Sequence, residues 1–226
     1  MTANASGAGR DGRTQDEVAH FFRLHLQMHG PNWRGLGWQS RHNQERRFAV
    51  LMEVGALPDT RVLDVGCGVG DLYGYMLRQG VRVRYTGMDI LPEMVAHGRE
   101  RYPDARFEVG DALQGLGTER FDYVLCSGAF NVNFGNNEAA VRKILPELLA
   151  RCRRGVAINF LSTRARERDA ILYNYDPQAM LAFCRTLTPR VRLVEGYLTN
   201  DFTLHMYPEK NESPSPPTSE QKGNAP

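Results

Sequence analysis

Short apolar runs alternate with amphipathic stretches along most of this 226-residue chain. Five runs carry apolar side chains at consecutive positions, which is typical of strands buried on both faces. These runs are residues 61–66, 83–90, 106–111, 121–128 and 155–162. Helical spacing of apolar residues is found at 71–79, 92–101, 137–151 and 176–187. Pro146 allows a kink, or two shorter helices, in the third of these stretches. Strand–helix alternation predicts an α/β fold with a doubly wound, mostly parallel sheet.

The end of the apolar pattern departs from this alternation. The predicted strands 190–197 and 202–207 are separated by only four residues. Such a gap permits a hairpin but is too short for a helical crossover between parallel strands. The sequence therefore predicts a seven-stranded sheet whose last strand is antiparallel.

The pattern also predicts how the chain is organised. Residues 16–54 are mainly helical in pattern, with an interruption at 33–37, and are expected to cover a nucleotide-binding core at 55–207. Together they form a single domain, 16–207. The leader 1–15 and the proline-rich tail 208–226 have little apolar content and are expected to be disordered.

Composition narrows the function classes only slightly. The formal net charge of +2 is too small to indicate nucleic-acid binding by itself. No apolar stretch approaches the length of a membrane span, and the N-terminus lacks the apolar centre of a signal peptide, so a cytoplasmic location is expected. The four cysteines lie far apart without a C-x-x-C pair, which predicts reduced thiols and no metal site.

The first predicted strand leads into a glycine-rich turn, VLDVGCGVG at residues 62–70, and a helix follows. Glycines let the backbone adopt left-handed angles and approach a ligand closely. A dinucleotide fingerprint starting at Gly66 would need glycine at the position of Asp71, and no P-loop sequence is present. Asp64, just before the turn, suits a cationic group such as an α-ammonium.

Polar positions also follow the next three predicted strands. Asp89 ends the second strand, where a carboxylate can accept both hydroxyls of a ribose. Asp111, followed by Ala112, comes after the third strand and can accept an adenine amino group; Ser127 comes after the fourth. Open α/β sheets bind ligands at the carboxyl ends of their strands, so we expect these residues to share one site.

In this order, VLDVGCGVGD, YTGMDI, FEVGDA and FDYVLCSG resemble the first four motifs of the class I S-adenosylmethionine-dependent methyltransferases. The resemblance runs from about Phe48 to Tyr207. It implies a Rossmann-like methyltransferase fold, with the antiparallel seventh strand that is a hallmark of the family. It also implies S-adenosyl-L-methionine as cofactor and S-adenosyl-L-homocysteine as product.

The resemblance further implies roles for individual residues. Gly66, Cys67 and Gly68 would line the methionine portion of the cofactor, with Asp64 near its ammonium group. Asp89 would hold the ribose, and Ile90 would pack on the adenine. The remaining implied contacts are Asp111 and Ala112 at the adenine edge and Ser127 beside the methionine portion.

Methyl transfer from a sulfonium is an in-line displacement that needs positioning and desolvation more than it needs a catalytic group. Candidate bases are nevertheless His205, Tyr173 and Tyr175, each with a structural role as the alternative, and further candidates are His25, His29, His42 and Tyr197. Arg41 or Gln44 is a candidate partner of the cofactor carboxylate. Cys67 is expected to be a small filler of the turn rather than a nucleophile.

The acceptor is not specified by any motif. The Asn/Asp-Pro-Pro-Tyr motif of enzymes that methylate base amino groups is absent after the fourth strand, where Ser127 to Asn131 stand. This absence favours a small-molecule acceptor over a nucleic acid, and an RNA or protein acceptor stays an alternative. Alternatives from other classes are an NAD(P)-dependent oxidoreductase and a non-catalytic nucleoside-binding protein.

Overall fold

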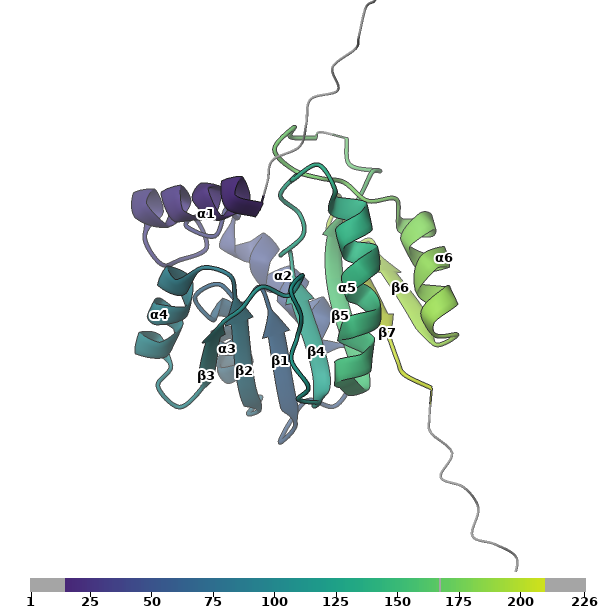
Figure 1. Cartoon of the computed structure of the whole chain (residues 1–226), viewed down its shortest axis with the longest axis horizontal. Coiled ribbons are helices and arrows are strands. Elements are labelled where there is room, and N and C mark those ends of the chain that lie inside the picture. Colours follow the sequence, from purple (N-terminus) through teal and green to yellow (C-terminus); the bar gives the residue numbers. More distant parts are fainter. Residues whose placement is uncertain (1–14, 167, 210–226) are drawn as a thin grey trace, which may run out of the picture.

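The computed structural model describes residues 15–166 and 168–209, and a seven-stranded mixed sheet runs through them (Figure 1). The strands lie in the order β3-β2-β1-β4-β5-β7-β6. Their bounds are β1 Arg61–Val65, β2 Arg84–Asp89, β3 Arg106–Val109, β4 Phe121–Ser127, β5 Cys152–Leu161, β6 Val191–Glu195 and β7 Asp201–Met206. Strands β1 to β5 pair in parallel, whereas β7 is antiparallel to both β5 and β6. The predicted fold, including the antiparallel last strand, is confirmed.

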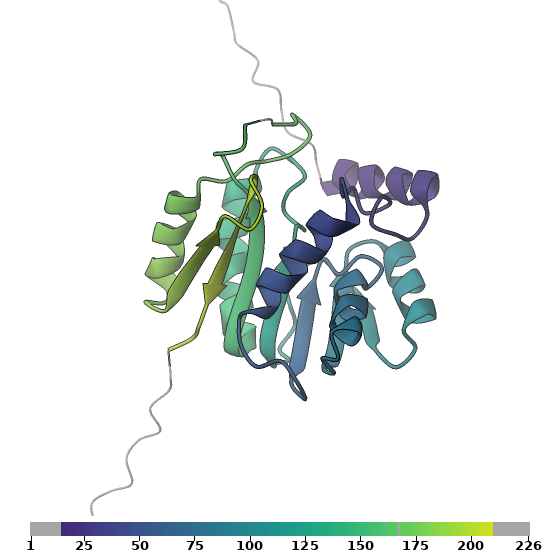
Figure 2. The ribbon, with the colours of Figure 1, turned by 180° about the vertical axis from the view of Figure 1, so that it is seen from behind.

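Helices cover both faces of the sheet and one of its edges. Helices α5 (Asn137–Arg151) and α6 (Pro177–Leu187) lie on the face seen in Figure 1. Helices α2 (Arg41–Met52) and α3 (Asp71–Arg78) lie on the opposite face, seen in Figure 2. Helix α4 (Pro92–Arg101) packs against β2 and β3. Helix α1 (Gln15–His29) lies across the carboxyl ends of β2 and β3.

Two apolar cores stabilise these layers. Phe160, Phe202 and Ile144 belong to the larger core, between the sheet and helices α5 and α6. Leu51, Leu72 and other buried residues of α2 and α3 form the second core on the opposite face. Because both faces are covered, the central strands are buried at nearly every position, which explains their consecutive apolar residues.

Two boundaries differ from the sequence-based expectation. Helix α5 is continuous through Pro146, with no division into shorter helices, because its buried face packs along the sheet on both sides of the proline. Strand β5 begins at Cys152, directly after α5, and not at residue 155. The reason is that Arg153 and Arg154 are exposed, so the first residues of the strand show no run of apolar side chains.

The predicted disordered leader and tail fall almost entirely on residues 1–14 and 210–226, which lie outside the described residues. The four cysteines are free and buried. None of the helices in the described part of the chain combines the length and the apolar character needed to cross a bilayer.

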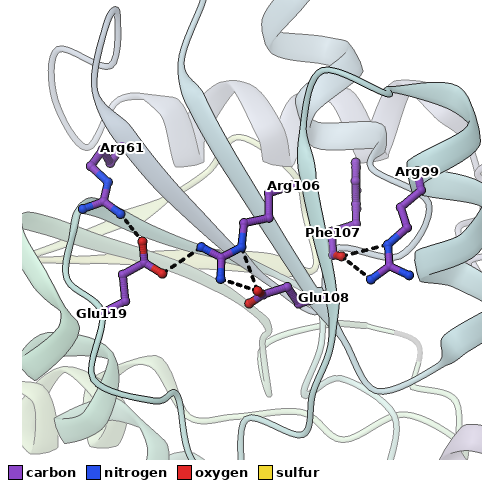
Figure 3. Close-up of polar contacts among 6 residues, drawn as sticks. All are labelled: Arg61, Arg99, Arg106, Phe107, Glu108 and Glu119. Carbon is purple, nitrogen blue, oxygen red and sulfur yellow. Dashed lines mark hydrogen bonds and ion pairs between the residues drawn. The ribbon is translucent and has the colours of Figure 1, made fainter.

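Arginines at the amino ends of the strands form a structural ion-pair network (Figure 3). Arg61 at the start of β1 and Arg106 at the start of β3 both pair with Glu119, and Arg106 also pairs with Glu108. Arg99 of α4 donates two hydrogen bonds, of 3.0 and 2.7 Å, to the carbonyl oxygen of Phe107. These contacts link the outer strand β3 to β1 through Glu119, and to α4 through Arg99.

Candidate active site

The glycine-rich turn connects β1 to α3 and has the left-handed backbone that its sequence predicts. Gly66 has a φ of 72° and Gly68 a φ of 53°. A Cβ at Gly66 would collide with the side chain of Ala129, and one at Gly68 would lie 2.7 Å from Leu36. The backbone N–H groups of Gly66 and Cys67 donate to the carbonyl oxygen of Met88 at 2.8 and 3.0 Å. Glycine is therefore required here both by conformation and by close packing.

Asp64 lies beneath this turn with only 2% of its surface exposed. The hydroxyl of Tyr85 donates to its Oδ2 atom at 2.6 Å, while Oδ1 has no hydrogen-bond partner among the described residues. Burial raises the pKa of this carboxyl to about 7, the Tyr85 hydrogen bond opposes that rise, and nearby Asp89 adds to it. A buried carboxylate with a free oxygen, lining a cleft, is suited to an ammonium group.

Asp89 ends β2 and braces the turn from the side. Its Oδ2 atom accepts from the N–H of Gly68 at 2.8 Å, and Oδ1 accepts from the N–H of Leu91 at 3.0 Å. A carboxylate has about four lone-pair positions, so both oxygens retain capacity for ligand hydroxyls. Burial raises the pKa of this carboxyl. The neighbouring Ile90 is 39% exposed on the wall of the cleft, as a surface for a flat apolar ring would be.

The loops after β3 and β4 form the remaining wall of the cleft. Asp111 accepts a hydrogen bond from the N–H of Leu113 at 2.9 Å, which holds the loop after β3 in a turn. Ser127 ends β4, with Nδ2 of Asn159 3.5 Å from its hydroxyl oxygen. Gly128 follows with a φ of 73°.

All these side chains line a single cleft, although they come from four different strand ends. Of the residues predicted to bind cofactor, the cleft contains Asp64, Gly66, Cys67, Gly68, Asp89, Ile90, Asp111, Ala112 and Ser127. Burial raises the pKa of the Cys67 thiol, so this cysteine is an inert filler of the turn rather than a nucleophile. A structure with these loops pointing apart would have contradicted a shared site.

Arg41 does not line the cleft. It is exposed at the start of α2 and lies 3.5 Å from Glu45 in an ion pair. Gln44, one turn further along the same helix, is buried and does line it. The side-chain amide of Gln44 donates from Nε2 to Oδ2 of Asp71 at 3.0 Å. The sequence predicted the helix but not its rotation about its own axis. That rotation decides which of Arg41 and Gln44 faces the cleft.

The candidate bases also lie outside the cleft. His205 is fully buried on β7, where Nε2 lies 3.0 Å from the carbonyl oxygen of Val50 and Nδ1 accepts from Arg192. Tyr175 donates from its hydroxyl to the carbonyl oxygen of Phe130 at 2.8 Å, and Tyr173 packs against Tyr175. These contacts correspond to the structural alternatives considered for the three residues.

Of the other candidates, His25 contacts the carbonyl oxygen of Phe21 within α1. His29 and His42 are exposed, and neither lines the cleft. Tyr197 lies near β7, with its hydroxyl 2.8 Å from that of Thr203. Among the described residues there is no group of three or more potential metal ligands.

Helices α1 and α2 and the segment between them contribute cleft residues that the motif analysis missed. Phe22, Leu36, Trp38 and Phe48 form the apolar cover, and Asp71 at the start of α3 is a polar member of the wall. Arg23 of α1 is fixed to Glu93 of α4 by an ion pair of 2.7 Å. Helical periodicity was the available sequence signal for this cover, but periodicity does not say which residues face the cleft.

A second cavity, of about 1050 Å³, adjoins the cleft. Phe22, Leu36, Trp38 and Gly128 line both spaces. The far side of the second cavity is formed by residues 168–174 and 196–201, after β5 and between β6 and β7. Its volume is at the upper end of the range for small-molecule sites.

The chain was compared with known proteins. Residues 62–155 match the family described as methyltransferase domain. Rv1506c of Mycobacterium tuberculosis (strain ATCC 25618 / H37Rv), a protein named as a methyltransferase, is 32% identical over 159 residues, which are 67% of this chain and 95% of that protein. A demethylmenaquinone methyltransferase of Thermotoga maritima is 26% identical over 165 residues, covering 73% of this chain and 66% of that one.

Solved structures share the fold at lower identity. The crystal structure of magnesium protoporphyrin IX methyltransferase from Synechocystis PCC 6803, with bound S-adenosylmethionine, superposes with a TM-score of 0.64. The superposition covers 91% of this chain and all of that one at 20% identity, so it shows the fold alone. The sequence relatives, the ordered motifs and the converging strand ends agree. The chain therefore belongs to the class I S-adenosylmethionine-dependent methyltransferases, and S-adenosylmethionine is its cofactor.

Proposed function

We propose that this methyltransferase acts on a small molecule that binds in the second cavity. The observation that carries the proposal is the junction of the two spaces at Trp38 and Gly128, beside the strand end where Ser127 lies. The cavity is bounded by α1, the segment after it and two loops, which is an enclosure of small-molecule size. Membership of the methyltransferase family excludes the alternative of an NAD(P)-dependent oxidoreductase.

The residues of the cleft fit the cofactor. The unpaired Oδ1 of Asp64 matches its ammonium group, and the carboxylate of Asp89 matches its ribose hydroxyls. Ile90 offers an exposed apolar surface for the adenine, with Asp111 and Ala112 at the edge of that ring. Gln44 replaces Arg41 as the proposed partner of the carboxylate, because only Gln44 lines the cleft.

When bound, S-adenosylmethionine would supply a methyl group that its positively charged sulfur activates. A lone pair of the acceptor would form the new bond to the methyl carbon, and the sulfur would keep the electron pair of the broken C–S bond. The task of the chain is then to position the acceptor and exclude water. Phe22, Trp38 and Leu36 form an apolar junction for this purpose. None of the four described residues that line both spaces carries a basic side chain.

The small-molecule proposal can be tested with a tritiated methyl donor. Purified protein and labelled S-adenosylmethionine would be incubated separately with the small-molecule, protein and RNA fractions of a cell extract. We expect label in the small-molecule fraction, and markedly less label with the Asp89→Ala variant at a donor concentration near the parent's dissociation constant. Label in RNA or protein would contradict the proposal and leave the family assignment intact.

A further inference from the structure

Asn131 presents a hydrogen-bond donor at the place where the cofactor cleft meets the second cavity. The residue follows the end of β4 and lines the second cavity. Its Nδ2 atom lies 3.3 Å from the position that a Cβ at Gly128 would occupy, and Cη2 of Trp38 lies at the same distance from that position. Gly128 and Trp38 line both spaces. The side-chain amide of Asn131 therefore borders the junction on its second-cavity side.

The remaining polar groups of Asn131 are held by the fold, which fixes the direction of this amide. Its backbone N–H donates to the carbonyl oxygen of Gly128 at 3.1 Å, and its own carbonyl oxygen accepts from the N–H of Tyr173 at 2.8 Å. In the side chain, Oδ1 accepts from the N–H of Leu161 at 3.3 Å, which leaves Nδ2 as the end toward the junction. Asn131 is only 6% exposed. Because the residue is already ordered, a ligand that binds to it loses little free energy in ordering it further.

The Nδ2 atom of Asn131 is a free donor. It has no hydrogen-bond partner among the described residues, whereas the amide nitrogen of Asn174, on the same cavity, donates to the carbonyl oxygen of Ser162 at 3.0 Å. It is also not enclosed: unlike Oδ1 of Asn159, which is buried without a partner, Nδ2 of Asn131 keeps accessible surface. An amide nitrogen carries two N–H donors. The junction therefore offers a donor to a molecule bound in the second cavity.

A donor at this point selects the kind of atom that can receive the methyl group. The receiving atom must direct one lone pair at the methyl carbon. An oxygen has a further lone pair with which to accept a hydrogen bond from Asn131, whereas a neutral amine nitrogen has only one lone pair. An amine would also set its own N–H groups against those of Nδ2. The donor therefore favours an oxygen acceptor over a nitrogen acceptor.

The lining of the two spaces also favours an oxygen that arrives without a proton. Among the residues that the structure describes, neither space is lined by a histidine or a lysine. The two acids of the second cavity are engaged. Asp201 pairs with Arg47, and Asp169 accepts from the N–H of Ile171 at 2.9 Å. A carboxylate is ionised at neutral pH, whereas an alcohol or a phenol must first lose a proton. An oxygen anion also accepts a stronger hydrogen bond than a neutral oxygen does.

Building on the proposed function, we infer that the acceptor is a carboxylic acid, and that Asn131 orients its carboxylate at the junction for the formation of a methyl ester. One carboxylate oxygen forms the new C–O bond to the methyl carbon while the C–S bond breaks, and the electron pair of that bond stays on the sulfur. No proton moves, because the carboxylate enters ionised. The products are a methyl ester and S-adenosyl-L-homocysteine.

The chemical stability of the transferred label tests this inference before the acceptor is known. The full chain would be incubated with methyl-tritiated S-adenosylmethionine and the small-molecule fraction of a cell extract. Mild alkali then hydrolyses methyl esters and releases volatile methanol, whereas methyl groups on ethers, amines and carbon stay attached. We expect most of the transferred label to become volatile.

The outcomes separate the inference from the proposed function. Small-molecule label that stays involatile in alkali would overturn the carboxylate acceptor and leave the proposed function intact. Transfer only to RNA or protein, or no transfer by a chain that binds S-adenosylhomocysteine in calorimetry, would count against the proposed function.

The variant Asn131→Asp tests the donor itself. It keeps the shape of the side chain and an acceptor for Leu161, but it replaces Nδ2 by an oxygen. We expect volatile label to form about tenfold more slowly or less, with an unchanged affinity for S-adenosylhomocysteine, because Asn131 does not line the cofactor cleft. The matched control is Asn200→Asp, which adds the same charge on the far side of the same cavity and should slow the reaction much less.

An unchanged rate in Asn131→Asp, or an equal loss in both variants, would contradict the role of Asn131. If Asn131→Asp does not fold, the alkali test on the unaltered chain still decides whether the acceptor is a carboxylic acid.

Discussion

The buried carboxyl of Asp64 leads to a prediction with opposite effects on stability and on binding. Its pKa rises from 3.8 to about 7 in the folded chain, a difference of about 3 units. Each unit corresponds to about 1.4 kcal/mol, so the ionised form destabilises the unliganded fold by up to about 4 kcal/mol. Because the folded pKa is raised, the stability that the protonated group confers is fully present below pH 4 and is lost as pH rises through 7.

The variant Asp64→Asn removes this ionisation while keeping the acceptor for Tyr85. We expect the unliganded variant to be more stable than the parent at pH 8, by up to about 4 kcal/mol, and to differ little near pH 4. Urea denaturation at both pH values measures this difference. Tyr85→Phe removes a hydrogen bond that lowers the Asp64 pKa, so it should move the pH dependence of stability upward.

The affinity for S-adenosylhomocysteine should depend on pH in the opposite direction to stability, because binding needs the ionised form of Asp64. Only the ionised carboxylate attracts the ammonium group, and its fraction falls from about one half at pH 7 to about one tenth at pH 6, so the affinity of the parent for S-adenosylhomocysteine should fall about fivefold over that range. Calorimetry on Asp64→Asn should show weak binding without this pH dependence. Asp122→Asn, a change at the opposite edge of the sheet, is the control. An Asp64→Asn variant that binds with parental affinity and a parental pH profile would refute the reasoning.

Three further predictions concern the cofactor site and the support of α2. Asp89→Ala should weaken S-adenosylhomocysteine binding by about 1.5–3 kcal/mol, the range for a hydrogen bond to a charged group, whereas calorimetry showing unchanged affinity would reject its ribose role. Gly66→Ala should abolish binding and lower the melting temperature, because its Cβ meets Ala129; Gly80→Ala has a similar φ but open space, so it should show only the backbone strain of about 1–2 kcal/mol. Burial lowers the pKa of His205 to about 4, so its contribution to stability is present above pH 6.5 and is lost as pH falls toward 4. In His205→Gln, urea denaturation should show a shallower loss of stability over that window, and an unchanged slope would contradict this assignment.

The strand ends could be read from sequence because their signals are local. A buried parallel strand is apolar at successive positions, and the residue that follows it lies at the carboxyl edge of the sheet. Asp64, Asp89 and Asp111 could therefore be assigned to one edge before any contact between them was known. Their convergence on one cleft follows from the parallel pairing of β1, β2 and β3.

The cover of the cleft depends on contacts that no local pattern encodes. Periodicity predicted helices in residues 16–54, yet the rotation that buries Gln44 and exposes Arg41 results from packing of α2 against the sheet. His205 carried the same ambiguity, since an imidazole on a strand can face a cleft or a helix. Its place beneath Val50 was decided by the antiparallel hairpin of β6 and β7.

The sequence by itself determined which polar residues follow each strand, that they lie at the carboxyl edge of the sheet, and that the last strand is antiparallel. Each of these features depends on residues that are neighbours along the chain. The tertiary structure alone decided the second cavity and the pair of Arg47 with Asp201. These two residues lie far apart in the sequence. They meet because β7 pairs with β5 in the sheet and α2 packs against β5 and β7. Long-range packing of this kind leaves no trace in spacing or periodicity.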